Sequence, residues 1–233
     1  MKYIKKYNEK VNYSDVDPFE EEEWEESITS YFNRIYPELN GNYKDVDRLI
    51  LTEKDIIFDE NDMEILSNLN DLYLDGCNVK HIERISACHE LNSLNIYNNY
   101  DFSLKSIRNL DQLEFLHLDN CRINDLSPIK NLINIKVLNV TNNQITSLEP
   151  LLQLTELYAL YCNHNHINSL HGLENCVKLN RLFCNFNFLN NSEEIISILK
   201  LLPLVEDPTV CDNMLLNNDD MKKIKNYIRD RYS

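Results

Sequence analysis

The sequence has few glycines: of its 233 residues, only Gly41, Gly76 and Gly172 are glycine. Glycine-rich phosphate loops and the glycine-flanked serine of a nucleophile elbow need two or more glycines within a few residues of each other. Isolated glycines cannot supply these motifs. The sequence therefore excludes nucleotide-binding and hydrolase sites of those kinds.

Long apolar runs are also missing. A membrane-spanning helix requires about 18 or more largely uncharged apolar residues, and no segment of the sequence approaches this. The residues from Met1 to Lys6 lead into polar sequence, unlike the apolar core of a secretory signal. We therefore expect no membrane partner and an intracellular location, in the cytoplasm.

Paired cysteine motifs do not occur either. The seven cysteines are an odd number with no C-x-x-C pair, which indicates free buried thiols in a reducing compartment instead of a disulfide framework or a zinc module. Cys162, His164 and His166 offer ligand atoms, but the repeat pattern predicts that Cys162 points inward and His164 outward. We expect no metal ion and no cofactor.

Positive charge is scarce, because 23 Lys and Arg residues stand against 38 Asp and Glu residues and leave a net charge of −15. Nucleic-acid backbones are bound by basic surfaces, so we expect no nucleic-acid partner. A protein partner, with a basic segment or with a neutral complementary patch, fits this charge better.

What the sequence does contain is an internal repeat of 22 residues. From the second copy onward, the opening apolar residues are Leu69, Leu91, Leu113, Ile135, Leu157, Leu179 and Leu201, and Val46 opens a first copy 23 residues before Leu69. Counted from the opening residue, apolar residues recur at +3, at +5 and usually at +10, and again near +13, +16 and +19, while +8 holds Asn or Cys. Chance does not supply so many matches in one register.

The repeat predicts a stack of strands. Alternating apolar residues at +3 and +5 are typical of a short strand, and the spacing of three that follows suits a 3₁₀ turn or a short helix. One copy cannot bury its own apolar edge, so the copies must stack with their strands in a parallel sheet. At +8 a buried Asn amide, or a small Cys, can satisfy backbone groups where the chain turns. This column comprises Asn99, Asn143, Asn165, Asn187, Cys77 and Cys121.

The pattern L-x-x-L-x-L-x-x-[N/C]-x-I resembles the leucine-rich repeat. Residues 123–129 and 145–151, INDLSPI and ITSLEPL, resemble the short subclass found in bacterial internalins and phosphatase-regulatory repeat proteins. The resemblance covers residues 46–205, about seven to eight copies, with departures at Lys54, at Asp101 and after Leu204. It implies an α/β fold: a curved leucine-rich-repeat solenoid with a parallel concave β-sheet, a convex side of 3₁₀ and short helices, and helical caps at both ends.

Such a stack needs caps on its first and last apolar faces. Asp17 and Pro18 predict the start of a cap helix over 18–36, and apolar residues at helical spacing predict another over 218–232. We therefore divide the chain into a mobile tail over 1–17, an acidic cap helix and linker over 18–45, the repeats over 46–205, and a C-terminal cap over 206–233.

Residues at +2, +4 and +6 should point outward and form one continuous surface, the concave side of the solenoid, which we call the strand face. The row at +2 is Arg48, Asp71, Ser93, Phe115, Val137, Ala159 and Arg181. The row at +4 is Ile50, Tyr73, Asn95, His117, Asn139, Tyr161 and Phe183. The row at +6 is Thr52, Asp75, Tyr97, Asp119, Thr141, Asn163 and Asn185.

Aromatic residues and arginine on an exposed surface are typical of protein interfaces. We therefore predict a partner-binding site formed by Tyr73, Tyr97, Phe115, His117, Tyr161, Arg181 and Phe183, with an acidic margin of Asp71, Asp75 and Asp119. This margin would steer a basic segment of the partner. Phe183, Phe186 and Phe188 have a second interpretation, in which they pack under the C-terminal cap.

The leading interpretation is a non-catalytic scaffold that binds a partner protein on its concave surface. An open sheet lacks the enclosed pocket that catalysis favours, so we expect no enzyme. The resemblance implies two alternatives: a regulatory subunit that modulates an enzyme such as a phosphatase, and an adhesion or host-interaction factor, against which the free cysteines count. A further alternative places the function in the acidic run 20–26 around Trp24, which otherwise supplies favourable charge at a helix start.

Overall fold

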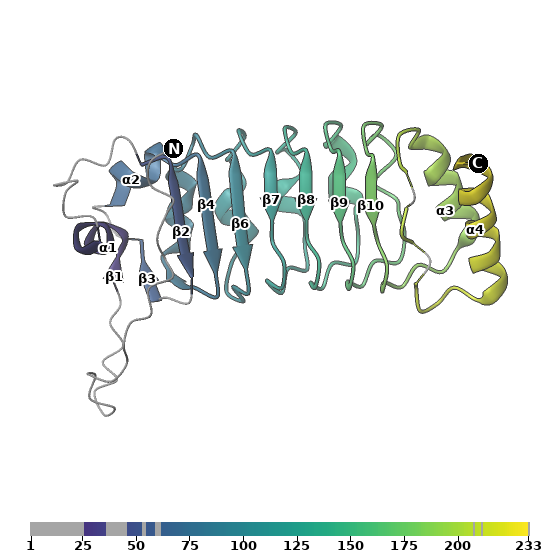
Figure 1. The fold of residues 1–233 in the computed structure, drawn as a ribbon, viewed down its shortest axis with the longest axis horizontal. Coiled ribbons are helices and arrows are strands. Elements are labelled where there is room, and N and C mark those ends of the chain that lie inside the picture. The colour runs from purple at the N-terminus through teal and green to yellow at the C-terminus, as the bar shows by residue number, and fades with distance from the viewer. Residues whose placement is uncertain are drawn as a thin grey trace, which may run out of the picture.

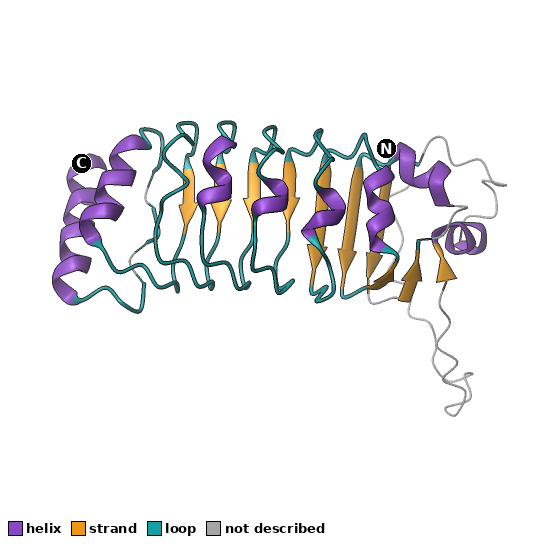
Figure 2. Cartoon of the chain, turned by 180° about the vertical axis from the view of Figure 1, so that it is seen from behind, coloured by secondary structure: helices purple, strands orange, loops and turns teal. Residues whose placement is uncertain are grey.

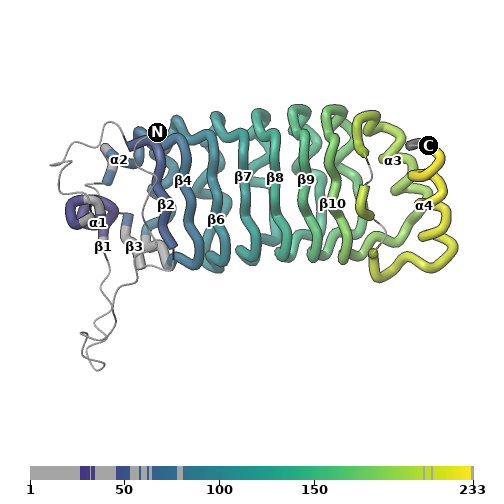
Figure 3. The backbone as a smooth tube through the Cα atoms, viewed as in Figure 1, coloured from purple at the N-terminus to yellow at the C-terminus, as the bar shows by residue number. Residues whose placement is uncertain are grey.

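The fold is an elongated stack of backbone coils (Figures 1 and 3). The computed structural model describes residues 26–35, 46–52, 55–58, 62–206, 208–210 and 212–232. Its main sheet has seven parallel strands in the order β2 (Arg48–Thr52), β4 (Asp71–Asp75), β6 (Ser93–Tyr97), β7 (Phe115–His117), β8 (Val137–Asn139), β9 (Ala159–Tyr161) and β10 (Arg181–Phe183). Each strand pairs with the strand of the next copy at the same repeat position, as Leu72 does with Leu94. The predicted leucine-rich-repeat architecture is confirmed.

Short helices lie behind this sheet (Figure 2). α2 (Met63–Asn68) is α-helical, and 3₁₀ helices span Ile82–Ala87, Leu104–Ile107, Ser127–Ile129 and Glu149–Gln153. Pro128 and Pro150 lie in the first turn of the last two, where a missing backbone N–H costs no hydrogen bond. The helices cover one side of the sheet, and no described element covers the side that faces the viewer in Figure 1.

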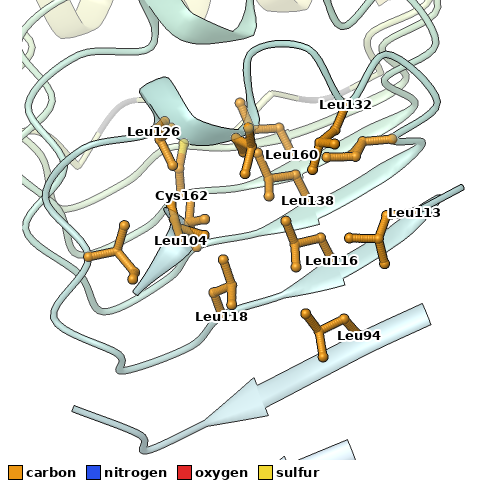
Figure 4. Close-up of a cluster of buried hydrophobic side chains, with 14 of the residues drawn as sticks. Leu94, Leu104, Leu113, Leu116, Leu118, Leu126, Leu132, Leu138, Leu160 and Cys162 are labelled. Atoms are coloured by element: carbon orange, nitrogen blue, oxygen red, sulfur yellow. The ribbon is translucent and has the colours of Figure 1, made fainter. Parts of the chain in front are cut away.

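The inward side chains of the strands form one continuous core (Figure 4). The +3 row is at most 1% exposed in every copy from the second to the seventh: Leu72, Leu94, Leu116, Leu138, Leu160 and Leu182. Each buried leucine contributes about 2 kcal/mol relative to an exposed one. Because each row is filled by successive copies, the stacking of one copy on the next buries the core.

The predicted column at +8 joins the copies by hydrogen bonds. The Asn143 Nδ2 donates to the carbonyl oxygen of Leu118 in the preceding copy at 2.6 Å and to that of Val140 at 3.0 Å. Its Oδ1 accepts from the backbone nitrogens of Cys121 and Ile123 at 3.1 and 2.8 Å. The four predicted asparagines are buried, and Cys77 and Cys121 are buried at the same position. This prediction is confirmed.

Gly172 lies at a close approach between two copies. Its φ is +109°, and a Cβ at this position would lie 2.1 Å from the carbonyl oxygen of Leu148. No side chain fits there, so glycine allows copies five and six to stack at this turn.

The N-terminal cap differs from the predicted helix over 18–36. Glu26 and Ser27 form a strand, β1, and α1 spans only Ile28–Ile35. The Ser27 hydroxyl accepts a hydrogen bond from the Ser30 backbone nitrogen at 3.1 Å, as an N-cap residue does. Trp24, the predicted tail over 1–17, Lys54 and the acidic run up to residue 25 lie outside the described residues.

A second, smaller parallel sheet lies beside the first copies. It has the order β1, β3 (Asp55–Ile57) and β5 (Asn78–Lys80). The sequence does not predict it, because its strands come from the cap and from the turns after β2 and β4. Pairing of β1 with β3 joins the cap to the first copy, and pairing of β3 with β5 joins the first copy to the second.

The last copy also differs from the prediction. The 22-residue spacing predicts Leu201 as an opening residue, but Leu201 ends α3 (Ser192–Leu201) and is 49% exposed. Because α3 is longer than the turns it replaces, the fully buried Val205 takes the opening place. The Glu206 backbone nitrogen then donates to the Asn180 carbonyl at 3.0 Å, as the Asn180 nitrogen does to the preceding copy.

The asparagine column continues beyond this shift. Asn213 is 6% exposed, and its Nδ2 donates to the carbonyl oxygens of Cys184 at 3.0 Å and Val210 at 2.8 Å. α4 (Asn218–Tyr232), the predicted C-terminal helix, then packs on α3 and buries Ile224. No helix within the described ranges is both long enough and apolar enough to cross a bilayer.

Candidate functional site

The strand face lies where the sequence places it. Strand pairing aligns the three predicted rows, with Arg48 opposite Asp71 at +2 and Ile50 opposite Tyr73 at +4. Ala159 is an exception among the outward residues, because at 3% exposure its short methyl group is buried between its larger row neighbours. The ten predicted binding residues all belong to these rows, and most of them fall into two groups on different halves of the sheet.

The first group surrounds Tyr97 on copies two to four. Tyr97 lies in the +6 row between Asp75, its partner in strand pairing, and Asp119. Its ring contacts Tyr73 at a centroid distance of 5.4 Å and His117 at 6.5 Å. All five side chains are partly buried. We call these five residues the Tyr97 cluster.

Two carboxylates set the charge of the Tyr97 cluster. Burial, followed by Tyr73, Asp119 and Asp75, raises the pKa of the Tyr97 hydroxyl. Burial and then Asp75 raise the pKa of Tyr73 in the same way. Burial lowers the pKa of His117, so its ring is neutral at pH 7. The cluster therefore carries the negative charge of Asp75 and Asp119 and no positive charge of its own.

Asparagines of the next turn orient both carboxylates. The Asn98 Nδ2 donates to Asp75 Oδ1 at 2.7 Å, and the Asn142 Nδ2 donates to Asp119 Oδ1 at 3.1 Å. These amides are neutral donors. Among the described residues, no lysine or arginine forms an ion pair with either carboxylate.

Three predicted residues lie outside both groups: Arg181, which lies beside the second group, and Asp71 and Phe115. Asp71 forms an ion pair with Arg48 at 2.7 Å, so most of its charge is balanced within the strand face. Phe115 is 37% exposed and lies in the +2 row between Ser93 and Val137, without a ring partner among the described residues.

The second group lies on copies six and seven, where rings of one copy stack on rings of the next. The rings of Tyr161 and Phe183 are stacked and nearly parallel, at an interplanar angle of 4° and a centroid distance of 4.9 Å. His164 stacks on Phe186 at 4.4 Å, and His166 contacts Phe188 at 5.6 Å. We call the six residues Tyr161, His164, His166, Phe183, Phe186 and Phe188 the Phe183 cluster.

Arg181 lies beside the Phe183 cluster. A side-chain hydrogen bond with the Tyr161 hydroxyl raises the pKa of the Arg181 guanidinium further above its usual value. The guanidinium therefore stays charged, and this half of the strand face presents rings and one cation where the other half presents carboxylates.

The three phenylalanines of copy seven contact rings of copy six. They do not belong to the buried core under the C-terminal cap, which is aliphatic: Ile195, Ile198, Leu199, Leu202, Val205, Val210 and Ile224. Phe186 is 50% exposed. The second interpretation, packing under the cap, is therefore not what the structure shows for these rings.

His164 and Phe186 belong to a row at +7 that sequence analysis does not single out. In copies two to seven, the residue of this row has a φ between +54° and +61°: Gly76, Asn98, Asn120, Asn142, His164 and Phe186. Glycine and asparagine tolerate this left-handed conformation, whereas a bulky residue there is uncommon. The signal was present as a column of Gly and Asn that changes to His and Phe in the last two copies.

A pocket of about 440 Å³ lies beside the irregular turn of copy three. Asp101 occupies the place of an apolar residue there, and Phe102, 8% exposed, fills the core one residue later. Cys77, Asn99 and Tyr100 also line the pocket. None of the ten predicted binding residues does.

The six described cysteines are buried, and none of them forms a disulfide bond. Burial raises the pKa of Cys88 and Cys176 to about 12 and that of Cys121 to about 11, so these thiols remain protonated. Cys162 is fully buried whereas His164 is exposed, as predicted. Their side chains therefore cannot bind one ion together.

Comparison with known proteins agrees with this architecture. Residues 111–153 match the family model for leucine-rich repeats in two copies. Internalin C2 of Listeria monocytogenes superposes with a TM-score of 0.63 and 21% sequence identity, covering 76% of this chain and 73% of that one. A leucine-rich repeat protein of Leptospira interrogans superposes with a TM-score of 0.53 and 19% identity, covering 80% of this chain and 54% of that one.

A second internalin of Listeria monocytogenes, InlF, has a TM-score of 0.50 and 20% identity, over 75% of this chain and 65% of that one. No curated protein matches the chain in sequence. At these identities the likeness concerns the fold, and the chain spans less than two thirds of InlF and about half of the Leptospira protein.

Proposed function

We propose that the chain is a non-catalytic scaffold that binds a partner protein across the strand face. The leucine-rich-repeat match over residues 111–153 and the internalin-like fold support this proposal. Stacked repeats generally use their extended sheet surface for binding. The Phe183 cluster is the observation that carries the proposal, since aromatic rings of two copies stack there on a face that no described element covers. Aromatic residues beside an arginine are the usual anchors of an interface.

The other half of the strand face supports a partner with a basic segment. Asp75 and Asp119 of the Tyr97 cluster form no ion pair with any residue that the structure describes, and the whole chain carries a net charge of −15. A negative surface raises the rate at which a positive segment arrives and favours one orientation of binding.

We further propose that the protein acts inside the cell, in the cytoplasm. The support is that the six described cysteines are buried without disulfide bonds, because proteins of oxidising compartments usually pair their cysteines. A partner that is itself an enzyme would make the chain a regulatory subunit, and a partner on another cell would make it an adhesion factor. Both use the same surface and differ in the partner alone.

The test is affinity capture from native lysate with the full chain and a Tyr161→Ala/Phe183→Ala variant. We expect the variant to recover a partner at least about tenfold less well, because each truncated anchor of an interface typically costs 2 kcal/mol or more. Mass spectrometry identifies the partner, and an assay of its reaction with and without the chain shows whether it is a regulated enzyme.

The matched control is Ile133→Ala/Val177→Ala, which removes two apolar side chains exposed at 54% and 49% outside the strand face. This control should capture the partner as the wild-type chain does. Equal recovery by a folded Tyr161→Ala/Phe183→Ala variant would show that the strand face is not the binding surface.

A further inference from the structure

We propose that the Tyr97 cluster is a subsite for a cationic side chain, an arginine guanidinium or a lysine ammonium of a bound peptide segment. This inference rests on the proposed function, because it assigns one chemical class of group to one half of the strand face. It adds a position and a recognition chemistry that the aromatic surface alone does not specify.

The Tyr97 cluster places aromatic rings and carboxylates around one position. Tyr97 lies between two carboxylates of the +6 row, Asp75 of copy two and Asp119 of copy four. Tyr73 and His117 flank it on the diagonals of the +4 row, at 5.4 and 6.5 Å between ring centroids. Neighbouring strands lie about 4.8 Å apart, so the two carboxylates are separated by about 10 Å with an aromatic ring between them. A cation above that ring is attracted electrostatically by both carboxylates.

The charge of the two carboxylates in the Tyr97 cluster is not balanced by a described residue. Asp71 in the neighbouring row is paired with Arg48, whereas Asp75 and Asp119 have no ion-pair partner among the described residues. Their hydrogen bonds come from the neutral amides of Asn98 and Asn142, which orient the carboxylates and leave their charge in place. A partner would bring the compensating charge.

The tyrosine rings of the Tyr97 cluster also favour a cation. The face of a tyrosine ring attracts a cation within about 6 Å of its centroid, and a carboxylate adds a charge-assisted hydrogen bond. An apolar group at this position would bury two carboxylates without compensation, which is unfavourable. The combination therefore selects a cation over an apolar or acidic side chain.

The experiment is a titration of the ¹⁵N-labelled full chain with the blocked tripeptide acetyl-Gly-Arg-Gly-amide, followed by backbone amide shifts. We expect saturable shifts confined to the copies around residues 71–75, 93–98 and 115–120. The same tripeptide with citrulline, which keeps the shape of arginine and loses its charge, should give no saturable shifts.

Two variants divide the recognition between its parts. In Asp75→Asn/Asp119→Asn, dissociation constants should rise about five- to tenfold, because two Coulomb interactions are lost while the hydrogen bonds from the asparagines are kept. In Tyr97→Leu, they should rise about two- to fivefold, because the cation–π contact is lost.

The control for net charge is Asp111→Asn/Asp125→Asn, which removes the same two charges from exposed turns outside the strand-face rows. If this control weakens binding as much as Asp75→Asn/Asp119→Asn, or if the shifts fall elsewhere, the subsite is wrong. The Tyr161→Ala/Phe183→Ala variant should bind the tripeptide normally. The tripeptide titration needs no partner, so failure of the subsite and failure of the proposed function are separate results.

Discussion

Asparagine meets two different backbone requirements at adjacent residues of each turn. At +7 it adopts the left-handed conformation, as Asn98 and Asn142 do. At +8 its buried side chain bonds to the backbone of its own copy and of the copy before it, as Asn99 and Asn143 do. The sequence pairs Asn98-Asn99 and Asn142-Asn143 therefore reflect two physical needs, of conformation and of hydrogen bonding.

Replacement of the buried amide should destabilise the protein strongly. Asn143→Ala leaves the backbone nitrogens of Cys121 and Ile123 and the carbonyl of Leu118 without their partner. Each buried polar group that loses its partner costs about 1–3 kcal/mol, so we expect the free energy of unfolding to fall by about 3 kcal/mol. Chemical denaturation monitored by circular dichroism measures this change.

Two comparisons make the result specific. Asn143→Cys should lose less than Asn143→Ala, because the Cys121 thiol at the equivalent position donates to the Ile96 carbonyl at 3.3 Å. Asn124→Ala, at an exposed position, should change stability by less than about 0.5 kcal/mol. A small loss in Asn143→Ala would mean that the column is not what joins the copies.

The buried column could be predicted because its members recur at a fixed spacing and one residue type satisfies the turn. Asn213 could not be assigned to it, since α3 shifts the register from Leu201 to Val205 before the column resumes. The left-handed row is not evident from the sequence, because His164 and Phe186 break the run of glycine and asparagine that is typical of this conformation.

Among the elements, α3 and α4 close the stack through backbone contacts as well as apolar packing. The last carbonyls of a helix have no partner within the helix. The Arg231 guanidinium of α4 donates to the Leu199 and Leu202 carbonyls at the end of α3, at 2.5 and 2.6 Å. One planar side chain thus fixes α4 on α3.

Loss of this guanidinium should loosen the C-terminal cap. In Arg231→Met we expect a loss of about 2 kcal/mol, because hydrogen bonds to charged groups are each worth about 1.5–3 kcal/mol. Arg231→Lys should not restore it, since an ammonium cannot reproduce the planar fork. Amide hydrogen exchange should show faster exchange confined to α3 and α4.

Arg229→Met is the matched control on the same helix, because among the described residues Arg229 bonds to the adjacent Asp230 alone and both side chains are 70% exposed. It should leave the exchange rates of α3 unchanged. Equal effects of the two substitutions would show that Arg231 acts through general helix stability and not through the α3 carbonyls.

Helices and strands that repeat can be predicted from the sequence, whereas those that occur once cannot. The strands recur in copies one to seven and the 3₁₀ helices in copies two to five, so their positions follow from one register. The cap helix begins at Ile28 because Glu26 and Ser27 pair with β3. Such pairing depends on residues that are distant in sequence and carry no periodic signal.

For the whole molecule, the excess of negative charge is spread over an elongated stack. A large net charge of one sign destabilises a folded protein through repulsion between its charges, and the value here is −15. Dissolved salt screens this repulsion, with a Debye length of about 10 Å at 0.1 M and about 3 Å at 1 M.

We therefore expect the midpoint of urea unfolding to rise when sodium chloride increases from about 0.02 to 0.3 M, and to level off above that range as screening becomes complete. Urea is the appropriate denaturant because it is uncharged. A midpoint that falls with salt would show that attractive ion pairs, such as Lys136 with Glu114 at 2.7 Å, outweigh the repulsion.

The outline of the candidate site also followed from the repeat, since Tyr73, His117 and Tyr161 share one row whatever the details of packing. What the register could not show is which residues are neutralised or stacked. The ion pair of Asp71 with Arg48 and the ring pairs of copies six and seven depend on side-chain rotamers, which a pattern of positions does not specify.

The strands of the sheet follow one another at a regular spacing, so the distance between two sites on the strand face is set by the number of copies between them. Tyr97 and Tyr161 are three copies apart. At about 4.8 Å per strand, their separation measured across the strands is about 14 Å. An extended ligand advances about 3.3 Å per residue. A segment that lies across the strands and binds both clusters would therefore need about four positions between its positive residue and its apolar residue. A segment with a different spacing could occupy the Tyr97 cluster or the Phe183 cluster, but not both.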